Sequence, residues 1–222
     1  MGEVFKRWLI IGPVLLYSVI LHEMSHGYVA LLNGDPTALN AGRLTLNPIP
    51  HIDLFGSILL PLVQIVSRAP FFLAWAKPVP YNPALFVTEV RLATLEVALA
   101  GPFTNMLLAL MSTFVLRAVG GILGGSRAGQ LVRKGLVFAV MINVSLMIFN
   151  FMPIPPLDGF TLVRFFFPVV DRLGIFNNFM TGIVILMLVL YVARNFLTKP
   201  AAALTSALLD WAIPAAPGED RP

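Results

Sequence analysis

Cysteine is absent from this chain of 222 residues, so neither disulfides nor thiolate metal ligands are available to it. Charged residues are scarce as well: they make up 12% of the chain, against about 25% in a typical soluble domain. No cluster of basic residues with interleaved aromatics is present, so nucleic acid is excluded as a partner. There is also no internal repeat, which argues against repeat architectures.

Apolar residues dominate what remains. They account for 58% of the chain, and the mean hydropathy is +0.85. The net charge of +4 is small and spread along the sequence, which fits residues that flank lipid headgroups. This composition predicts an integral membrane protein with one intramembrane domain over residues 1–200. Residues 201–222 are expected to form a surface helix and a frayed tail.

Four apolar runs predict membrane helices, and they cover residues 8–32, 88–119, 136–151 and 175–197. A fifth run, Gly56–Trp75, is interrupted by two prolines and an arginine, so it either spans the bilayer or enters and leaves on one side. The polar stretch Thr37–Asp53 alternates briefly and predicts a strand or hairpin at the membrane surface. The expected fold is an all-α membrane protein, a polytopic bundle of about four to five transmembrane helices. It would carry a re-entrant segment and this small surface strand or hairpin element.

The first apolar run contains two histidines four positions apart, with a carboxylate beside the first. Residues four apart share one face of a helix, so His22 and His26 can bind one metal ion. Glu23 flanks that face and can reach a water on the metal. This is the H-E-x-x-H pattern of zinc proteases, in which the Glu is the general base. Burying ionisable groups in a membrane is costly, which favours a functional role over simple packing.

A catalytic zinc site needs a third protein ligand. Nearly all the other acidic residues lie in polar loops, at helix ends or in the tails, whereas Asp158 lies in a proline-rich break after an apolar run. Unwound backbone at membrane depth must be buried or line a wet cavity, where a carboxylate can face inward. If Gly56–Trp75 is re-entrant, Asp158 reaches the level of the histidines, so we expect re-entry. The alternative, that Asp158 caps a helix beginning near Phe160, stays open.

Three further polar residues are candidates with weaker arguments. His51 lies in a polar loop, where a lone histidine is more often a surface residue than a ligand. Asn105 and Asn150 lie in apolar runs and are ordinary candidates for hydrogen bonds between helices.

With these residues in place, the chain resembles the site-2 protease family, the intramembrane zinc metalloproteases. It is most similar to the short bacterial members that lack PDZ or CBS domains. The matching stretches are residues 22–27, 34–38, 42–48, 75–80, 100–105 and 149–159. Together they cover roughly residues 9–159, and the pairing of H-E-x-x-H with a later Leu-Asp-Gly is the specific part.

The resemblance implies hydrolysis of peptide bonds in transmembrane protein substrates, as in regulated intramembrane proteolysis. In that family His22, His26 and Asp158 would bind Zn²⁺, and Glu23 would take a proton from the zinc-activated water. Asn150 would stabilise the oxyanion or hold the substrate strand. The expected location is the bacterial cytoplasmic (inner) membrane, crossed several times, with zinc nearer the cytoplasm. The substrate's identity, the oligomeric state and the gating element do not follow from the sequence.

Two other functions fit parts of the pattern. A non-proteolytic metal-binding membrane protein or transporter also has broken helices and polar groups at the midplane. The missing inverted repeat and the glutamate beside the ligands argue against it. A different membrane zincin would use a glutamate on a later helix as third ligand, but no glutamate suits that role as well as Asp158 does.

Overall fold

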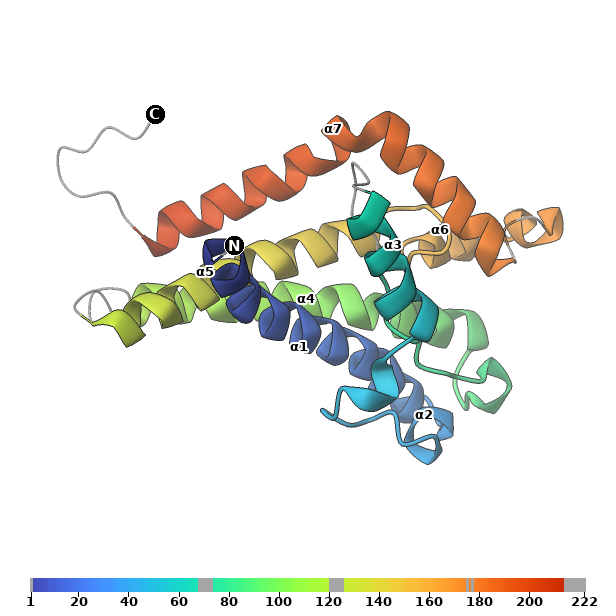
Figure 1. The fold of residues 1–222 in the computed structure, drawn as a ribbon. Coiled ribbons are helices and arrows are strands. Elements are labelled where there is room, and N and C mark those ends of the chain that lie inside the picture. The colour runs from blue at the N-terminus through green and yellow to red at the C-terminus, as the bar shows by residue number, and fades with distance from the viewer. Residues whose placement is uncertain (1, 68–73, 120–125, 175, 177, 214–222) are drawn as a thin grey trace. The chain divides into compact units, whose positions relative to one another are not determined.

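Long apolar helices make up most of the chain in the computed structural model (Figure 1). The structure describes residues 2–67, 74–119, 126–174, 176 and 178–213. Three of the described helices are long and apolar enough to cross a bilayer: the part of α1 (Gly2–Leu32) from Trp8 onward, α4 (Val90–Val119) and α5 (Arg127–Phe151). No strand occurs among the described residues. The predicted all-α membrane protein is therefore confirmed, because a helix is the fold that satisfies the backbone of a lipid-embedded segment internally.

The number of spans, four to five by prediction, stays a prediction. The fourth candidate is α7 (Phe179–Ala212), which is strongly apolar over residues Phe179–Val192. The predicted last span, residues 175–197, includes positions 175 and 177, which lie outside the described residues.

The chain divides into two compact units. One contains Met1–Ser18 and Pro102–Pro222, and the other contains Val19–Gly101. Both boundaries fall inside long helices, α1 and α4. This division differs from the predicted boundary at residue 200, which stays a prediction.

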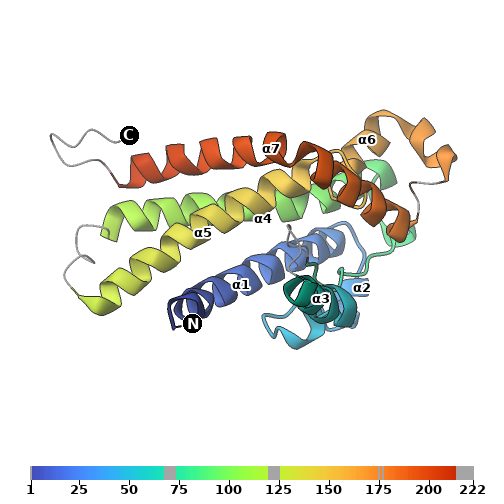
Figure 2. The same ribbon diagram turned by 45° about the horizontal axis from the view of Figure 1, so that its top comes forward.

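In the first unit, α5 and α7 lie side by side, as both views show (Figures 1 and 2). They share a core with α4 that consists of Ala109, Val140 and Val144, with Ala201, Leu208 and Leu209 packed against it. Residues 201–212 continue α7, and three of them pack against this core. The surface helix and tail predicted over residues 201–222 stay a prediction. α7 bends (Figure 1) and contains Pro200, whose ring cannot donate to the carbonyl four residues earlier.

A polar network also joins helices of this unit. Asn105 is fully buried and donates to Asn143 Oδ1 over 2.8 Å, and Asn143 Nδ2 donates to Ser18 Oγ over 2.9 Å. These three residues come from α4, α5 and α1. The interhelical role considered for Asn105 matches this contact.

α5 begins earlier than predicted. The predicted apolar run starts at residue 136, but the helix starts at Arg127 because Ser126 caps it: its Oγ accepts from Gly129 N over 3.0 Å.

The second unit, Val19–Gly101, holds the end of α1, the start of α4 and several short helices between them. These are α2 (Thr37–Asn40), η1 (Ile49–His51), η2 (Leu54–Leu59), α3 (Leu60–Ser67) and η3 (Pro83–Leu85). Ala30, Phe86, Ala93 and Val97 form its apolar core.

The segment Gly56–Trp75 starts and ends at the same place. Trp75 N donates to Gly56 O over 3.2 Å, and Ser57 Oγ donates to Trp75 O over 2.8 Å. The eight residues of α3 reach only about 12 Å, far short of about 30 Å of hydrocarbon. The two ends therefore meet, as re-entry requires and a full crossing forbids. Residues 68–73 lie outside the described residues.

The strand or hairpin predicted over Thr37–Asp53 is wrong. This stretch forms α2, turns and η1. Its side chains bond to their own backbone: Asn47 N donates to Thr45 Oγ1 and Ile49 N donates to Asn47 Oδ1, each over 3.1 Å. Gly42 adds a turn with a φ of +65°. Such local bonds compete with a strand ladder, so the short alternation does not produce one.

Candidate metal centre

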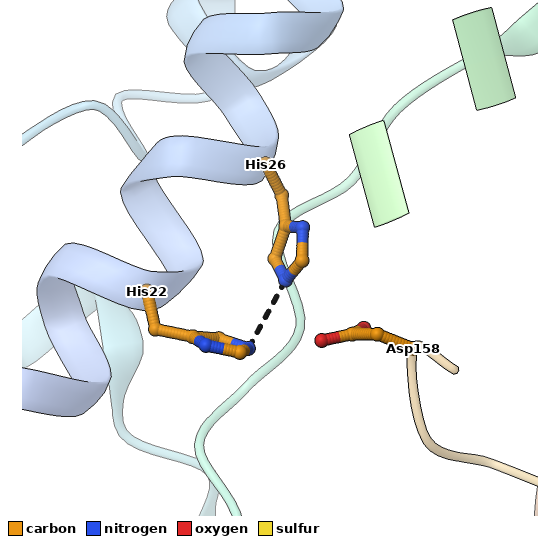
Figure 3. Close-up of side chains that lie close together, drawn as sticks. All are labelled: His22, His26 and Asp158. Atoms are coloured by element: carbon orange, nitrogen blue, oxygen red, sulfur yellow. Dashed lines mark hydrogen bonds between the residues drawn. The ribbon is translucent and has the colours of Figure 1, made fainter. Parts of the chain in front are cut away.

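Two imidazoles of α1 face each other. His22 and His26 lie one helical turn apart, with their Nε2 atoms 3.1 Å apart and their rings almost perpendicular, at 87° (Figure 3). Two nitrogens bound to one zinc ion at about 2.0–2.1 Å would be about 3.3 Å apart. His22 is only 6% exposed. The pair is therefore spaced for a single metal ion, as the i, i+4 pattern predicts.

A backbone carbonyl fixes the tautomer of His26. Its Nδ1 lies 2.6 Å from the carbonyl oxygen of Val97 on α4. A carbonyl only accepts, so Nδ1 carries the hydrogen and Nε2 keeps its lone pair toward His22. Metal-binding histidines are held in this way, with the second ring nitrogen donating to a backbone oxygen or a carboxylate.

Gly101 of α4 leaves room beside the imidazoles. A Cβ added there would lie 2.4 Å from His22 Cε1 and 2.6 Å from Nε2 of both His22 and His26. Those distances are too short for any side chain, so position 101 keeps the space between the two nitrogens open. From the sequence, Gly101 was only one residue of the matching stretch 100–105. A glycine before a proline in mid-helix was the feature that could have indicated this role.

Glu23 points to a different part of the unit. Its Oε2 accepts from the backbone N–H of Val79 over 3.0 Å. Val79 lies in the extended segment Lys77–Pro80, which approaches α1 at Gly27. A Cβ on Gly27 would lie 3.0 Å from Val79 Cγ1 and 2.7 Å from Leu44 Cδ2, so only glycine allows this approach.

Asp158 lies in the turn that follows α5. Gly159 N donates to Asn150 O over 2.7 Å, and a Cβ on Gly159 would lie 2.3 Å from Phe151 O, so the chain turns back tightly on the helix end. The first amides of α6 (Phe160–Phe166) donate to backbone carbonyls, and its N-cap position is Gly159. The alternative of Asp158 as the helix cap is therefore not supported.

His22 and His26 of one unit offer imidazole nitrogens, and Asp158 of the other unit offers a carboxylate oxygen (Figure 3). Two imidazole nitrogens and one carboxylate oxygen are a donor set that zinc accepts, with a position left for water. Together with the space at Gly101, these residues fit a zinc ion.

The remaining predicted residues have hydrogen-bond partners of their own. Asn150 Nδ2 donates to Leu146 O of its own helix over 3.0 Å. His51 is not a surface residue, because it is buried and its Nε2 lies 2.9 Å from Thr45 O. Asp35, for which no role was predicted from the sequence, is fully buried. It accepts from the hydroxyl and backbone of Thr37 and from Asn82 N. Burial raises the pKa of Asp35, but these hydrogen bonds outweigh it and hold the pKa below its ordinary value.

Comparison with known proteins points to one family. Residues 11–194 match the family described as peptidase family M50. YwhC of Bacillus subtilis, by name a candidate zinc metalloprotease, is 38% identical over 154 residues, which are 68% of this chain and 65% of YwhC. Rip2 of Mycolicibacterium smegmatis, named in the same way, is 30% identical over 65% of this chain and 52% of Rip2. Rip2 of Mycobacterium tuberculosis is 30% identical over 67% of this chain and 54% of that protein.

The chain therefore spans between about half and two-thirds of the length of these relatives. No solved structure matches it.

Proposed function

Because the chain belongs to peptidase family M50, we propose that it is a zinc-dependent intramembrane endopeptidase that cleaves transmembrane segments of other membrane proteins. The observation that carries this proposal is the pair of imidazoles on an apolar helix, 3.1 Å apart and with Glu23 next to the first. Three helices able to cross a bilayer support a reaction inside the membrane. We place the protein in the bacterial cytoplasmic membrane, crossed several times, as for the site-2 proteases that it resembles.

His22, His26 and Asp158 would hold the zinc ion. Zinc supplies a Lewis acid that acidifies water and polarises a peptide carbonyl. The His26–Val97 contact supports this assignment, because it keeps the ring oriented with Nε2 toward the space beside Gly101.

Glu23 would act as the general base. One carboxylate oxygen, Oε2, is held by Val79 N, so the carboxylate keeps one orientation while the other oxygen takes the proton from the attacking water. The same group can then deliver that proton to the leaving amine. Asn150 would donate its amide N–H to the substrate, either to the developing oxyanion or to the backbone of the unwound strand, once its side chain leaves Leu146 O.

Cleavage by the purified protein in lipid vesicles tests the proposal. We expect wild-type protein loaded with zinc to cut a co-reconstituted transmembrane substrate, and Glu23→Gln to bind as much zinc but to lose at least about 100-fold in kcat. Arg127→Gln, which removes an exposed charge at the start of α5, serves as the matched control and should cleave normally. Equal cleavage by wild type and Glu23→Gln would remove Glu23 as base. Zinc binding without cleavage of any transmembrane substrate offered would favour the metal-binding protein or transporter.

A further inference from the structure

A buried arginine holds the segment whose amide binds Glu23. Arg43 is only 5% exposed, although it follows the turn at Gly42 in a polar stretch. Its Nη2 donates to Lys77 O over 2.6 Å, and its Nη1 donates to Pro78 O over 3.1 Å. Burying a guanidinium is costly. A buried guanidinium that donates to two successive backbone carbonyls therefore indicates a specific structural or functional role.

Residues 77–80, the segment that Arg43 holds, can donate few backbone hydrogen bonds. Pro78 and Pro80 have no N–H, so only Lys77 and Val79 can donate between residues 77 and 80. Lys77 N donates to His51 O over 2.9 Å, and Val79 N donates to Glu23 Oε2 over 3.0 Å. The carbonyls of Lys77 and Pro78 point to Arg43 and the next amide points to Glu23. Fixing the two carbonyls therefore fixes the position of that amide.

The charge of Glu23 also favours the buried position of the Arg43 guanidinium. Burial lowers the pKa of Arg43, and the negative charge of Glu23 partly offsets this by raising it. The negative charge of Glu23 therefore favours the charged form of the Arg43 guanidinium, while the peptide between them supplies the hydrogen bond to Glu23.

We propose that Arg43 is a positioning residue for Glu23: it holds Lys77 and Pro78 so that the N–H of Val79 fixes one oxygen of the base. This inference rests on the proposed function. A general base depends on its geometry, and a misplacement of about 1 Å can cost on the order of 100-fold in rate. Losing the arginine should therefore slow the chemical step and leave substrate binding and zinc binding unchanged.

Steady-state cleavage in vesicles, with zinc content and thermal unfolding measured on the same samples, tests this. Arg43→Lys keeps the charge but loses the fork that reaches two carbonyls. We expect its kcat to fall by about 10- to 100-fold, with KM within about twofold of wild type and an unchanged zinc content. Arg127→Lys, the same exchange at an exposed position at the start of α5, is the matched control and should cleave normally.

A second pair of variants tests the last link directly. Val79→Pro removes the N–H that reaches Glu23, in a segment already extended between two prolines, whereas Val79→Ala trims the side chain and keeps the N–H. We expect kcat of the proline variant to be at least about fivefold below that of the alanine variant, with equal zinc content. In the double variant Arg43→Lys/Val79→Pro, the losses should not multiply. Its kcat should stay within about twofold of the kcat of the less active single variant. Both changes break the same series of contacts, which runs from Arg43 through residues 77–79 to Glu23.

Several results would overturn the inference. A rise in KM at constant kcat would make Arg43 a substrate contact. Multiplying losses in the double variant would show that Arg43 acts independently of Val79. If even Arg43→Lys fails to fold or to bind zinc, the residue is structural. The proposed function fails separately: in that case wild type does not cleave, or Glu23→Gln cleaves like wild type, whatever the Arg43 variants do.

Discussion

At the scale of single residues, the space beside the two imidazoles depends on a side chain that is missing. Gly101 faces His22 and His26 with no Cβ, whereas the glycine at position 12 of α1 has nothing within 4 Å of a built Cβ. The same chemical change, glycine to alanine, therefore has different expected consequences at the two positions.

We predict that Gly101→Ala lowers zinc affinity by at least about tenfold, the range seen when groups around a metal site are disturbed. The added methyl would have to displace the imidazole of His22, whose Cε1 lies 2.4 Å away. Zinc bound per chain, titrated against a competing chelator, measures this. Gly12→Ala is the control and should bind zinc as wild type does. Wild-type affinity in Gly101→Ala would show that the imidazoles can move without loss.

A second prediction at this scale concerns acid. The folded-state pKa of Asp35 is depressed, so the stability that its carboxylate contributes is present above the unfolded pKa, near 3.8, and is lost as pH falls through the folded value. We expect the unfolding temperature of wild type to fall below about pH 4. Asp35→Asn should cost about 1–3 kcal/mol at pH 7, because an amide nitrogen cannot accept from Thr37 or Asn82.

The measurement is thermal unfolding in detergent from pH 3 to 7. Asp35→Asn should show a smaller drop at low pH than wild type, since the group that titrates is gone. Asp171→Asn, which removes a half-exposed carboxylate beside Arg164, is the control and should keep the wild-type pH profile. Identical profiles for wild type and Asp35→Asn would show that another carboxylate causes the acid sensitivity.

At the scale of elements, the segment Gly56–Trp75, whose two ends meet, decides from which side of the membrane each later helix starts. The hydrogen bonds between these two ends require that the chain leave on the side where it entered. A crossing at this point would reverse the side of the membrane on which every later element begins.

The absence of cysteine makes this simple to test, because any introduced thiol is unique. We predict that Ile52→Cys and Tyr81→Cys, at exposed positions before and after this segment, react with an impermeant maleimide from the same side of sealed vesicles. Arg127→Cys, at the start of α5, lies one membrane crossing after Tyr81 and should react from the other side. Labelling of Ile52→Cys and Tyr81→Cys from opposite sides would establish a full crossing.

At the scale of the whole molecule, the proposed ligands lie on α1 and in the turn after α5, far apart in sequence. A ligand that binds only the folded chain stabilises it by about 2.7 kcal/mol at a hundredfold excess over its Kd. We therefore expect zinc to raise the unfolding temperature by several degrees in wild type. His26→Ala and Asp158→Asn should abolish most of this shift, and a chelator should reverse it.

Asp171→Asn again provides a matched carboxylate control, and its zinc-dependent shift should equal that of wild type. A full zinc shift in Asp158→Asn would exclude Asp158 as a ligand, whatever its effect on cleavage. This readout does not depend on activity, so it separates metal binding from the choice of substrate.

The candidate ligands were accessible to sequence reasoning because each depends on local chemistry. The i, i+4 spacing places His22 and His26 on one face of any helix, and a proline-rich break isolates Asp158 from the other acids. Gly101 and Arg43 were not assigned their contacts. Neither the glycine's contact with the imidazoles nor the arginine's contact with residues 77–78 leaves a local pattern. The strand predicted over Thr37–Asp53 failed because alternation is short there and side chains compete for the backbone.

The sequence by itself determined that the protein lies in a lipid bilayer and that it is built of helices. A chain this apolar and this poor in charge must form its backbone hydrogen bonds internally in lipid. It also determined which residue types were available to bind a metal, since cysteine is absent. Only the tertiary structure decided that the segment after Gly56 returns to its start and that Gly101 leaves space beside the imidazoles. It also decided that a buried arginine holds the segment whose amide binds Glu23. Those contacts join residues distant in sequence, and packing, which no local pattern encodes, selects them.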